Sequence, residues 1–166
     1  METGELISVR EYLNTSYRPD CDYVDGQVVE RNLGEYEHAR LQARLAAYFI
    51  NRENEWKVQV MTEQRVRVSS ARFRIPDVCV VLGLEPQDPV LTKPPFICIE
   101  ILSREDRLAE MQRRVGDYLA MSVPYVWILD PATSKAWRCT TTGLNEAREF
   151  RTESPEMVVP LDALFQ

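Results

Sequence analysis

The chain has 166 residues, of which 45% are hydrophobic and 28% are charged, and this composition suits one soluble globular domain over residues 1–166. The formal net charge of −6 argues against binding of nucleic acid through an overall positive charge of the protein. No apolar segment approaches the length of a membrane span or of a signal-peptide core. The 4 cysteines are widely spaced without a Cys-x-x-Cys pair, so we expect reduced thiols, a cytoplasmic protein and no zinc site.

The first part of the chain predicts a short helix, a β-hairpin and a long helix. Ser8 is a candidate N-cap for a helix that ends near Asn14. Asp25-Gly26 is a turn signal between two β-rich arms, which indicates a hairpin over residues 21–32. The segment 35–51 has helical periodicity, with an apolar face formed by Leu41, Leu45, Tyr48 and Phe49.

The rest of the chain alternates strands with one more helix. Strands are predicted at both ends of residues 57–68, from near Asp77 to before Gly83, and over residues 96–102 and 125–129. Residues 135–141 and 147–152 predict a closing hairpin. The fold class is therefore α/β (α+β), with a mixed β-sheet flanked by helices and with N-terminal and C-terminal hairpins.

A helix is expected between the strands at 96–102 and 125–129. Ser103 and Asp106 have the spacing of a capping box, with Asp in place of Glu or Gln, so the helix would start there and run to about Met121. The residues predicted to face inward are Leu108, Met111, Val115, Tyr118 and Leu119.

Two carboxylates belong to strands that are otherwise apolar. Asp77 opens one strand and Glu100 lies near the end of the next, so the two side chains can converge if the strands are neighbours. Converging carboxylates suit Mg²⁺ and would repel each other without a cation, which raises the pKa of at least one of them. Alternatively, Asp77 caps a turn and Glu100 pairs with an arginine, and the spacing alone favours this structural interpretation.

Five segments together resemble the Uma-two family of restriction-endonuclease-like proteins. They are "DYVDGQVVERN", the histidine that follows it, "RIPDVCVV", "FICIEILSREDR" and "RRVGDYLAMSVPYVWILDP", and the match runs over about residues 23–151. The resemblance implies the restriction-endonuclease-like fold of the PD-(D/E)XK superfamily. It also implies cleavage of phosphodiester bonds in DNA that depends on Mg²⁺ or Mn²⁺.

The resemblance also implies roles for individual residues. Asp77 and Glu100 match the two acids of the family, and the main-chain carbonyl of Ile101 would be a third metal ligand. Ser103 matches the serine of the family's Glu-x-x-Ser motif.

The catalytic lysine of the superfamily is replaced in this chain. In the family this lysine lies four residues before a tyrosine that Tyr118 matches, so its position falls on Arg114. Arginine can bind a phosphate through two hydrogen bonds but does not release its proton. Arg114 is therefore predicted to act electrostatically, or else the protein is a degenerate nuclease.

A few other side chains are candidates for supporting roles. His38, the only histidine, is expected to orient a neighbour of the metal site rather than bind the metal. Glu30 and Glu37 could add an acidic contact, although a surface position is favoured for both. Solvated positions are also favoured for two runs of arginine, Arg65, Arg67, Arg72 and Arg74, and Arg104, Arg107, Arg113 and Arg114.

The prediction is thus a Mg²⁺-dependent DNA endonuclease that acts away from membranes. A homodimer is expected because two DNA strands must be cut. The alternative is a catalytically degenerate protein that binds DNA or another protein, since a fold does not fix a function.

Overall fold

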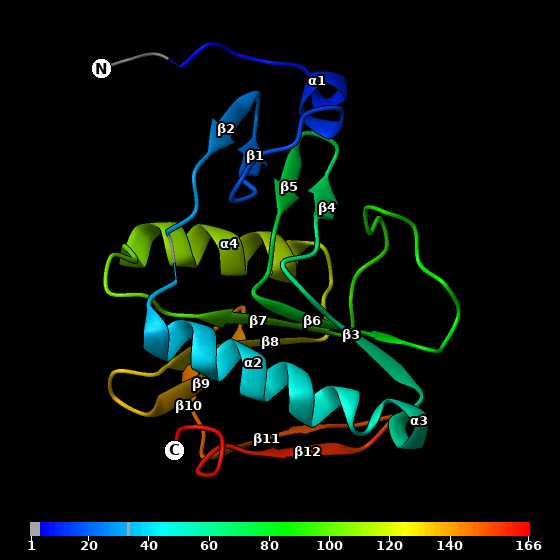
Figure 1. Cartoon of the computed structure of the whole chain (residues 1–166), viewed down its shortest axis with the longest axis vertical. Coiled ribbons are helices and arrows are strands. Elements are labelled where there is room, and N and C mark those ends of the chain that lie inside the picture. Colours follow the sequence, from blue (N-terminus) through cyan, green and yellow to red (C-terminus); the bar gives the residue numbers. More distant parts are fainter. Residues whose placement is uncertain (1–3, 33) are drawn as a thin grey trace.

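The computed structural model describes residues 4–32 and 34–166 (Figure 1). The helices are α1 (Val9–Leu13), α2 (Tyr36–Ile50), α3 (Glu53–Trp56) and α4 (Leu108–Ala120). The strands are β1 (Asp22–Val24), β2 (Gln27–Val29), β3 (Val58–Thr62), β4 (Val66–Ser69), β5 (Arg72–Arg74), β6 (Val78–Leu82), β7 (Ile97–Ile101), β8 (Tyr125–Asp130), β9 (Lys135–Thr140), β10 (Gly143–Glu146), β11 (Glu149–Thr152) and β12 (Met157–Pro160).

A small antiparallel sheet, in the order β2-β1-β5-β4, stands apart from the main sheet (Figure 1). As predicted, the turn at Asp25 and Gly26 joins β1 to β2, and both residues have positive φ angles, as a tight hairpin turn requires. Helix α1 begins where the hydroxyl of Ser8 accepts the backbone N–H of Glu11. The rings of Tyr12, Tyr23 and Phe73 form the apolar contact between α1 and the sheet.

The main sheet has six strands in the order β10-β9-β8-β7-β6-β3. Strands β7 and β8 run parallel because α4 connects them, and the other neighbours are antiparallel. Helix α4 covers one face, whereas α2 and the β11–β12 hairpin cover the other (Figure 1). The mixed α+β fold predicted from the sequence is confirmed.

Both faces of the central strands are apolar because both are covered. On one face Val78 and Val80 pack against Leu41, Leu45 and Phe49 of α2. On the other face Cys79 and Cys98 pack in the cluster that includes Met111, Val115 and Tyr118 of α4. The same alternation decides toward which face of the sheet a carboxylate points, both for Asp77, just before β6, and for Glu100, within β7.

Helix α4 starts later than the capping box predicts. Asp106 accepts the backbone N–H of Ser103 at 2.7 Å, but the hydroxyl of Ser103 finds no hydrogen-bond partner among the described residues. Only half of the box forms, and it closes a turn that precedes the helix. The helix begins at Leu108, which is 69% exposed rather than facing inward.

The predicted closing hairpin is also wrong in its pairing. Strand β9 pairs with β10, and β11 pairs with β12, so residues 135–141 and 147–152 belong to different hairpins. A short turn between Thr140 and Gly143 joins β9 to β10, and a short loop costs less conformational entropy to close than a longer one. Phe150 of β11 instead stacks on Trp127, with ring centroids 4.2 Å apart.

Candidate active site

Asp77 and Glu100 lie next to each other at the edge where β6 begins and β7 ends. Val78 pairs with Ile99, so continuing the same register places Asp77 opposite Glu100. Residues opposite each other in an antiparallel pair point to the same side of the sheet. The backbone N–H of Ile101 donates to Asp77 Oδ2 at 2.7 Å, and both carboxylates are buried. We call Asp77 and Glu100 the acid pair.

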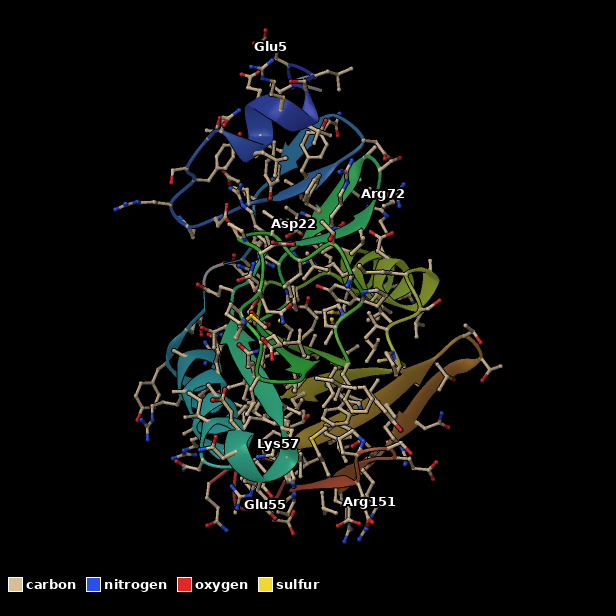
Figure 2. The ribbon with its side chains drawn as sticks, turned by 90° about the vertical axis from the view of Figure 1, so that its right-hand side faces the viewer. Glu5, Asp22, Glu55, Lys57, Arg72 and Arg151 are labelled. Atoms are coloured by element: carbon tan, nitrogen blue, oxygen red, sulfur yellow. The ribbon has the colours of Figure 1, made fainter. Side chains whose placement is uncertain are left out.

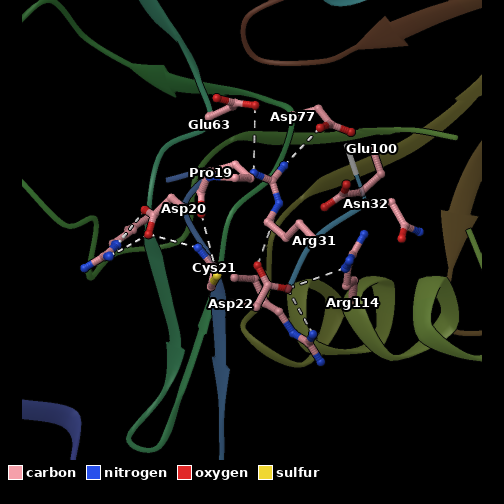
Figure 3. A network of polar contacts seen from close by, with 12 residues as sticks. Pro19, Asp20, Cys21, Asp22, Arg31, Asn32, Glu63, Asp77, Glu100 and Arg114 are labelled. Atoms are coloured by element: carbon pink, nitrogen blue, oxygen red, sulfur yellow. Dashed lines mark hydrogen bonds and ion pairs between the residues drawn. The ribbon is translucent and has the colours of Figure 1, made fainter. Parts of the chain in front are cut away.

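Protein donors surround the carboxylate of Asp77. Arg31, between β2 and α2, places its guanidinium 3.0 Å from Oδ1 (Figure 3). His38 of α2 places Nε2 3.3 Å from Oδ2. Gln42, one turn after His38, donates to the Asp77 carbonyl at 3.0 Å. Burial opposes ionisation, but the hydrogen bond from His38 and the charges of His38 and Arg31 outweigh it and hold the pKa of Asp77 below its usual value.

Glu100 has fewer partners than Asp77. The hydroxyl of Tyr118 donates to its Oε1 at 2.6 Å, and Oε2 has no hydrogen-bond partner among the described residues. Burial and then the neighbouring charge of Asp77 raise the pKa of Glu100 to about 8. One raised pKa in the pair agrees with the expectation from the sequence.

The acid pair fits a hard divalent cation in charge and in donor type. Residues 4–32 and 34–166 contain no group of three or more His, Cys, Asp and Glu side chains placed to hold a metal ion. Mg²⁺, however, is usually held by one or two carboxylates and keeps several waters. Two neighbouring carboxylates, of which Glu100 has a raised pKa and an oxygen without a hydrogen-bond partner among the described residues, are consistent with such a site.

Arg114 lies below the acid pair on α4, one helical turn before Tyr118 (Figure 3). Its Nε is 3.4 Å from Asp22 Oδ2 and 3.9 Å from Glu110 Oε1, and the side chain is buried. It forms no direct ion pair with Glu100, but its positive charge acts to lower the pKa of that residue. The structure therefore brings Arg114 to the site, held in place by Asp22.

A second group of buried charges was not predicted from the sequence. Arg74 of β5 donates to Asp22, Glu110 and Asp117 at 3.1, 2.9 and 2.7 Å. We call these four residues the anchor cluster, because it joins the small sheet to α4; Figure 2 shows Asp22 at this junction. Arg74 is only 1% exposed, so its predicted surface position is wrong. The acids that bind it come from distant segments, which no local pattern reveals.

The remaining candidates are spread around the site. Glu30 and Glu37 are exposed and make no contact with the acid pair, as their favoured surface positions predicted. Ser103 follows β7 with a buried and unpaired hydroxyl. His38 contacts Asp77 directly, and its orienting role stays a prediction.

A cavity of about 180 Å³ reaches Asp77 of the acid pair, and Glu100 is not part of its lining. Its lining includes Arg31, His38, Gln42, Glu63 and Asp77. A larger cavity, of about 550 Å³, lies along the proline-rich loop before β7 and does not reach either acid. The smaller cavity is therefore the relevant entrance to the site.

A central mixed sheet with helices on both faces makes this chain an α+β protein, and the acid pair lies at the edge of that sheet. The chain resembles a crystal structure described as a "putative nuclease" from Anabaena variabilis, with a TM-score of 0.80, 16% sequence identity and coverage of 96% of this chain and 97% of that chain. The Uma2 family model, described as "Putative restriction endonuclease", matches residues 9–165, so this chain belongs to that family.

No curated protein matches the chain by sequence. None of the helices in residues 4–32 and 34–166 is long and apolar enough to cross a membrane.

Proposed function

We propose that this protein hydrolyses phosphodiester bonds in DNA with a divalent cation, Mg²⁺ or Mn²⁺, held by Asp77, Glu100 and the carbonyl of Ile101. The observation that supports the proposal is that Asp77 and Glu100 are both buried and that the backbone N–H of Ile101, next to Glu100, donates to Asp77 Oδ2 at 2.7 Å. Membership in a family described as restriction endonucleases supports the same reaction class. A bound divalent cation would supply Lewis-acid stabilisation of the attacking water and of the leaving oxygen.

The chain's own residues would position the reacting groups. The N–H of Ile101 and the side chain of His38 fix the orientation of Asp77, and Tyr118 fixes one oxygen of Glu100. Arg114 keeps its proton, so its contribution is a fixed positive charge near the scissile phosphate. A solvent-derived water, rather than Arg114, would receive the proton of the nucleophile.

A binding protein without catalytic activity is the second candidate. It is favoured by the contacts of Asp77, whose two oxygens already accept from Arg31, His38 and Ile101. The arginine at the lysine position points the same way, because arginine cannot act as a general base. In this case the fold would bind DNA or a protein partner without cleaving it.

A plasmid-cleavage assay with Mg²⁺ or Mn²⁺ separates the two functions. Wild type is expected to nick or linearise the plasmid, and Asp77→Asn and Glu100→Gln are each expected to reduce the rate at least about 10²–10³-fold. Glu37→Gln makes the same chemical change at an exposed position and should leave the rate unchanged. Equal rates for wild type and both acid variants would refute the nuclease proposal, and DNA binding without cleavage would support the second candidate.

A further inference from the structure

Arg31 is the side chain at the acid pair that sequence patterns did not single out. It belongs to the irregular connection between β2 and α2, and its side chain is only 10% exposed. The guanidinium binds Asp77 Oδ1 at 3.0 Å, while Glu63 and Asp22 lie farther away, each with an N···O distance of 3.9 Å (Figure 3). One cationic side chain thus faces three carboxylates but is hydrogen-bonded to only one of them.

Asp22 offers Arg31 a second binding position. Asp22 Oδ2 accepts from Arg74, but its buried Oδ1 has no hydrogen-bond partner among the described residues. The Nε of Arg31 is the cationic nitrogen that lies 3.9 Å from this unpaired oxygen. A shift of about 1 Å would bring the two atoms to hydrogen-bonding distance. A buried acceptor without a donor is costly, so the fold favours a state in which it is paired.

We propose that Arg31 is an internal counter-ion that a divalent cation must displace from Asp77, and that the displaced guanidinium moves onto Asp22 Oδ1. This inference rests on the proposed function, because it takes the acid pair to be the metal site. Arg31 then sets the metal affinity of the site and keeps the acids compensated while no metal is bound.

The charges of the site explain why the guanidinium of Arg31 and a divalent cation do not both stay on Asp77. The acid pair carries two negative charges when ionised, which one divalent cation neutralises. A guanidinium left on Asp77 would add a like charge beside that cation, and like charges in a buried site repel strongly. Arginine does not relieve this repulsion by losing its proton, so it must move. The irregular backbone around Arg31 is compatible with such a movement.

Calorimetric titration of the full chain with MnCl₂ tests the displacement. Arg31→Met keeps the length of the side chain and removes the competitor, so Mn²⁺ should bind about 10- to 100-fold more tightly than to wild type. Arg31→Lys keeps the charge with poorer geometry and should shift the affinity less, in the same direction. Arg104→Met is the matched control, since Arg104 is 78% exposed, pairs only with Glu35 and should not change the affinity.

Melting temperatures provide a second measurement. Arg31→Met should melt lower than wild type in EDTA, because the acid pair loses its counter-ion, and saturating Mn²⁺ should narrow this difference. A purely structural Arg31 would lower the melting temperature without tightening Mn²⁺ binding, and that result overturns the inference. Weaker Mn²⁺ binding in Arg31→Met would also overturn it, since Arg31 would then assist the metal.

The two proposals fail in different ways. If Asp77→Asn abolishes Mn²⁺ binding while Arg31→Met binds like wild type, the metal site stands and the displacement of Arg31 is refuted. The proposed metal site is refuted, together with this inference, by either of two results. One is that neither wild type nor any variant binds Mn²⁺, and the other is that Asp77→Asn binds Mn²⁺ as tightly as wild type. Binding seen in Arg31→Met but not in wild type would support the displacement most strongly.

Discussion

The acid pair and the anchor cluster both bury carboxylates, but they compensate them differently. In the anchor cluster a fully buried Arg74 is shared by three acids, and Arg72 adds a further contact to Asp117. In the acid pair only Asp77 binds an arginine, and Glu100 has a tyrosine hydroxyl instead.

The difference indicates which group of acids is structural. Acids that are matched by buried arginines hold two parts of the fold together, although Asp22 keeps one buried oxygen without a hydrogen-bond partner among the described residues. The acid pair differs in that Glu100 accepts a tyrosine hydroxyl rather than an arginine and that a cavity reaches Asp77, and an incompletely compensated acid beside a cavity is typical of functional sites. We therefore expect substitutions in the anchor cluster to change stability, and substitutions around the acid pair to change metal response and activity.

The largest effect on stability is expected for Arg74→Met. The substitution leaves the buried carboxylate of Asp22 without its closest arginine and removes one of the two arginines of half-buried Asp117, and breaking a buried pair typically costs about 3–5 kcal/mol of unfolding free energy. Urea unfolding in EDTA measures this loss. Arg113→Met is the control, because Arg113 is 70% exposed and its pair with Glu110 contributes at most about 1 kcal/mol. Similar losses for the two variants would contradict the anchoring role of Arg74.

Arg114 lies between the two groups, so its variants sharpen the comparison. Arg114→Ala removes a charge from the proposed active site and should slow plasmid cleavage about 10²–10³-fold. Arg114→Lys restores the residue that the family resemblance places there and should keep or raise the rate. Cleavage by Arg114→Ala at the wild-type rate would assign Arg114 to the anchor cluster alone. Cleavage only by Arg114→Lys would make the natural protein a degenerate nuclease.

The stability of Tyr118→Phe at two pH values tests whether the tyrosine hydroxyl stabilises the negative charge of Glu100. Because the folded-state pKa of Glu100 is raised from 4.5 to about 8, its contribution to stability falls as pH rises between these values. The hydrogen bond from Tyr118 favours the charged form and opposes that fall. The variant should lose about 1 kcal/mol at pH 6 and about 2 kcal/mol at pH 9. Equal losses in metal-free unfolding at both pH values would show that Tyr118 does not stabilise charged Glu100.

The last prediction concerns the reactivity of the cysteine thiols, which lie outside both groups of acids and for which we expect the smallest effect. Burial raises the pKa of Cys79 and of Cys139 to about 12, and all 4 cysteines are buried free thiols. Few thiolates therefore form at pH 8, and a thiol reagent should label the native protein slowly but the urea-unfolded protein fully. Rapid labelling of Cys79, Cys98 or Cys139 in the native chain, located by peptide mapping, would show that the core around β6, β7 and β9 opens readily.

Local sequence patterns were sufficient to predict most helices and strands and the two strand ends at which Asp77 and Glu100 lie. The Asp25-Gly26 turn, the apolar face of α2 and the alternation in β6 and β7 each act over a few residues, so their elements formed as predicted. The pattern was insufficient where partners lie far apart. The sequence did not reveal β5, whose three residues pair with β1 and β4. Nor did it reveal that β9 pairs with β10 and β11 with β12, instead of β9 with β11.

By itself the sequence determined the two strands that carry Asp77 and Glu100, the helix that carries Arg114 and Tyr118, and the family to which they belong. Only the tertiary structure decided that Arg31 faces Asp77 and that Asp22 and Arg74 are buried together. The physical reason is that periodicity reports which side of an element is apolar, whereas an ion pair depends on which segments meet in space. Asp22 and Arg74 are 52 residues apart and meet only because β1 pairs with β5 beside α4.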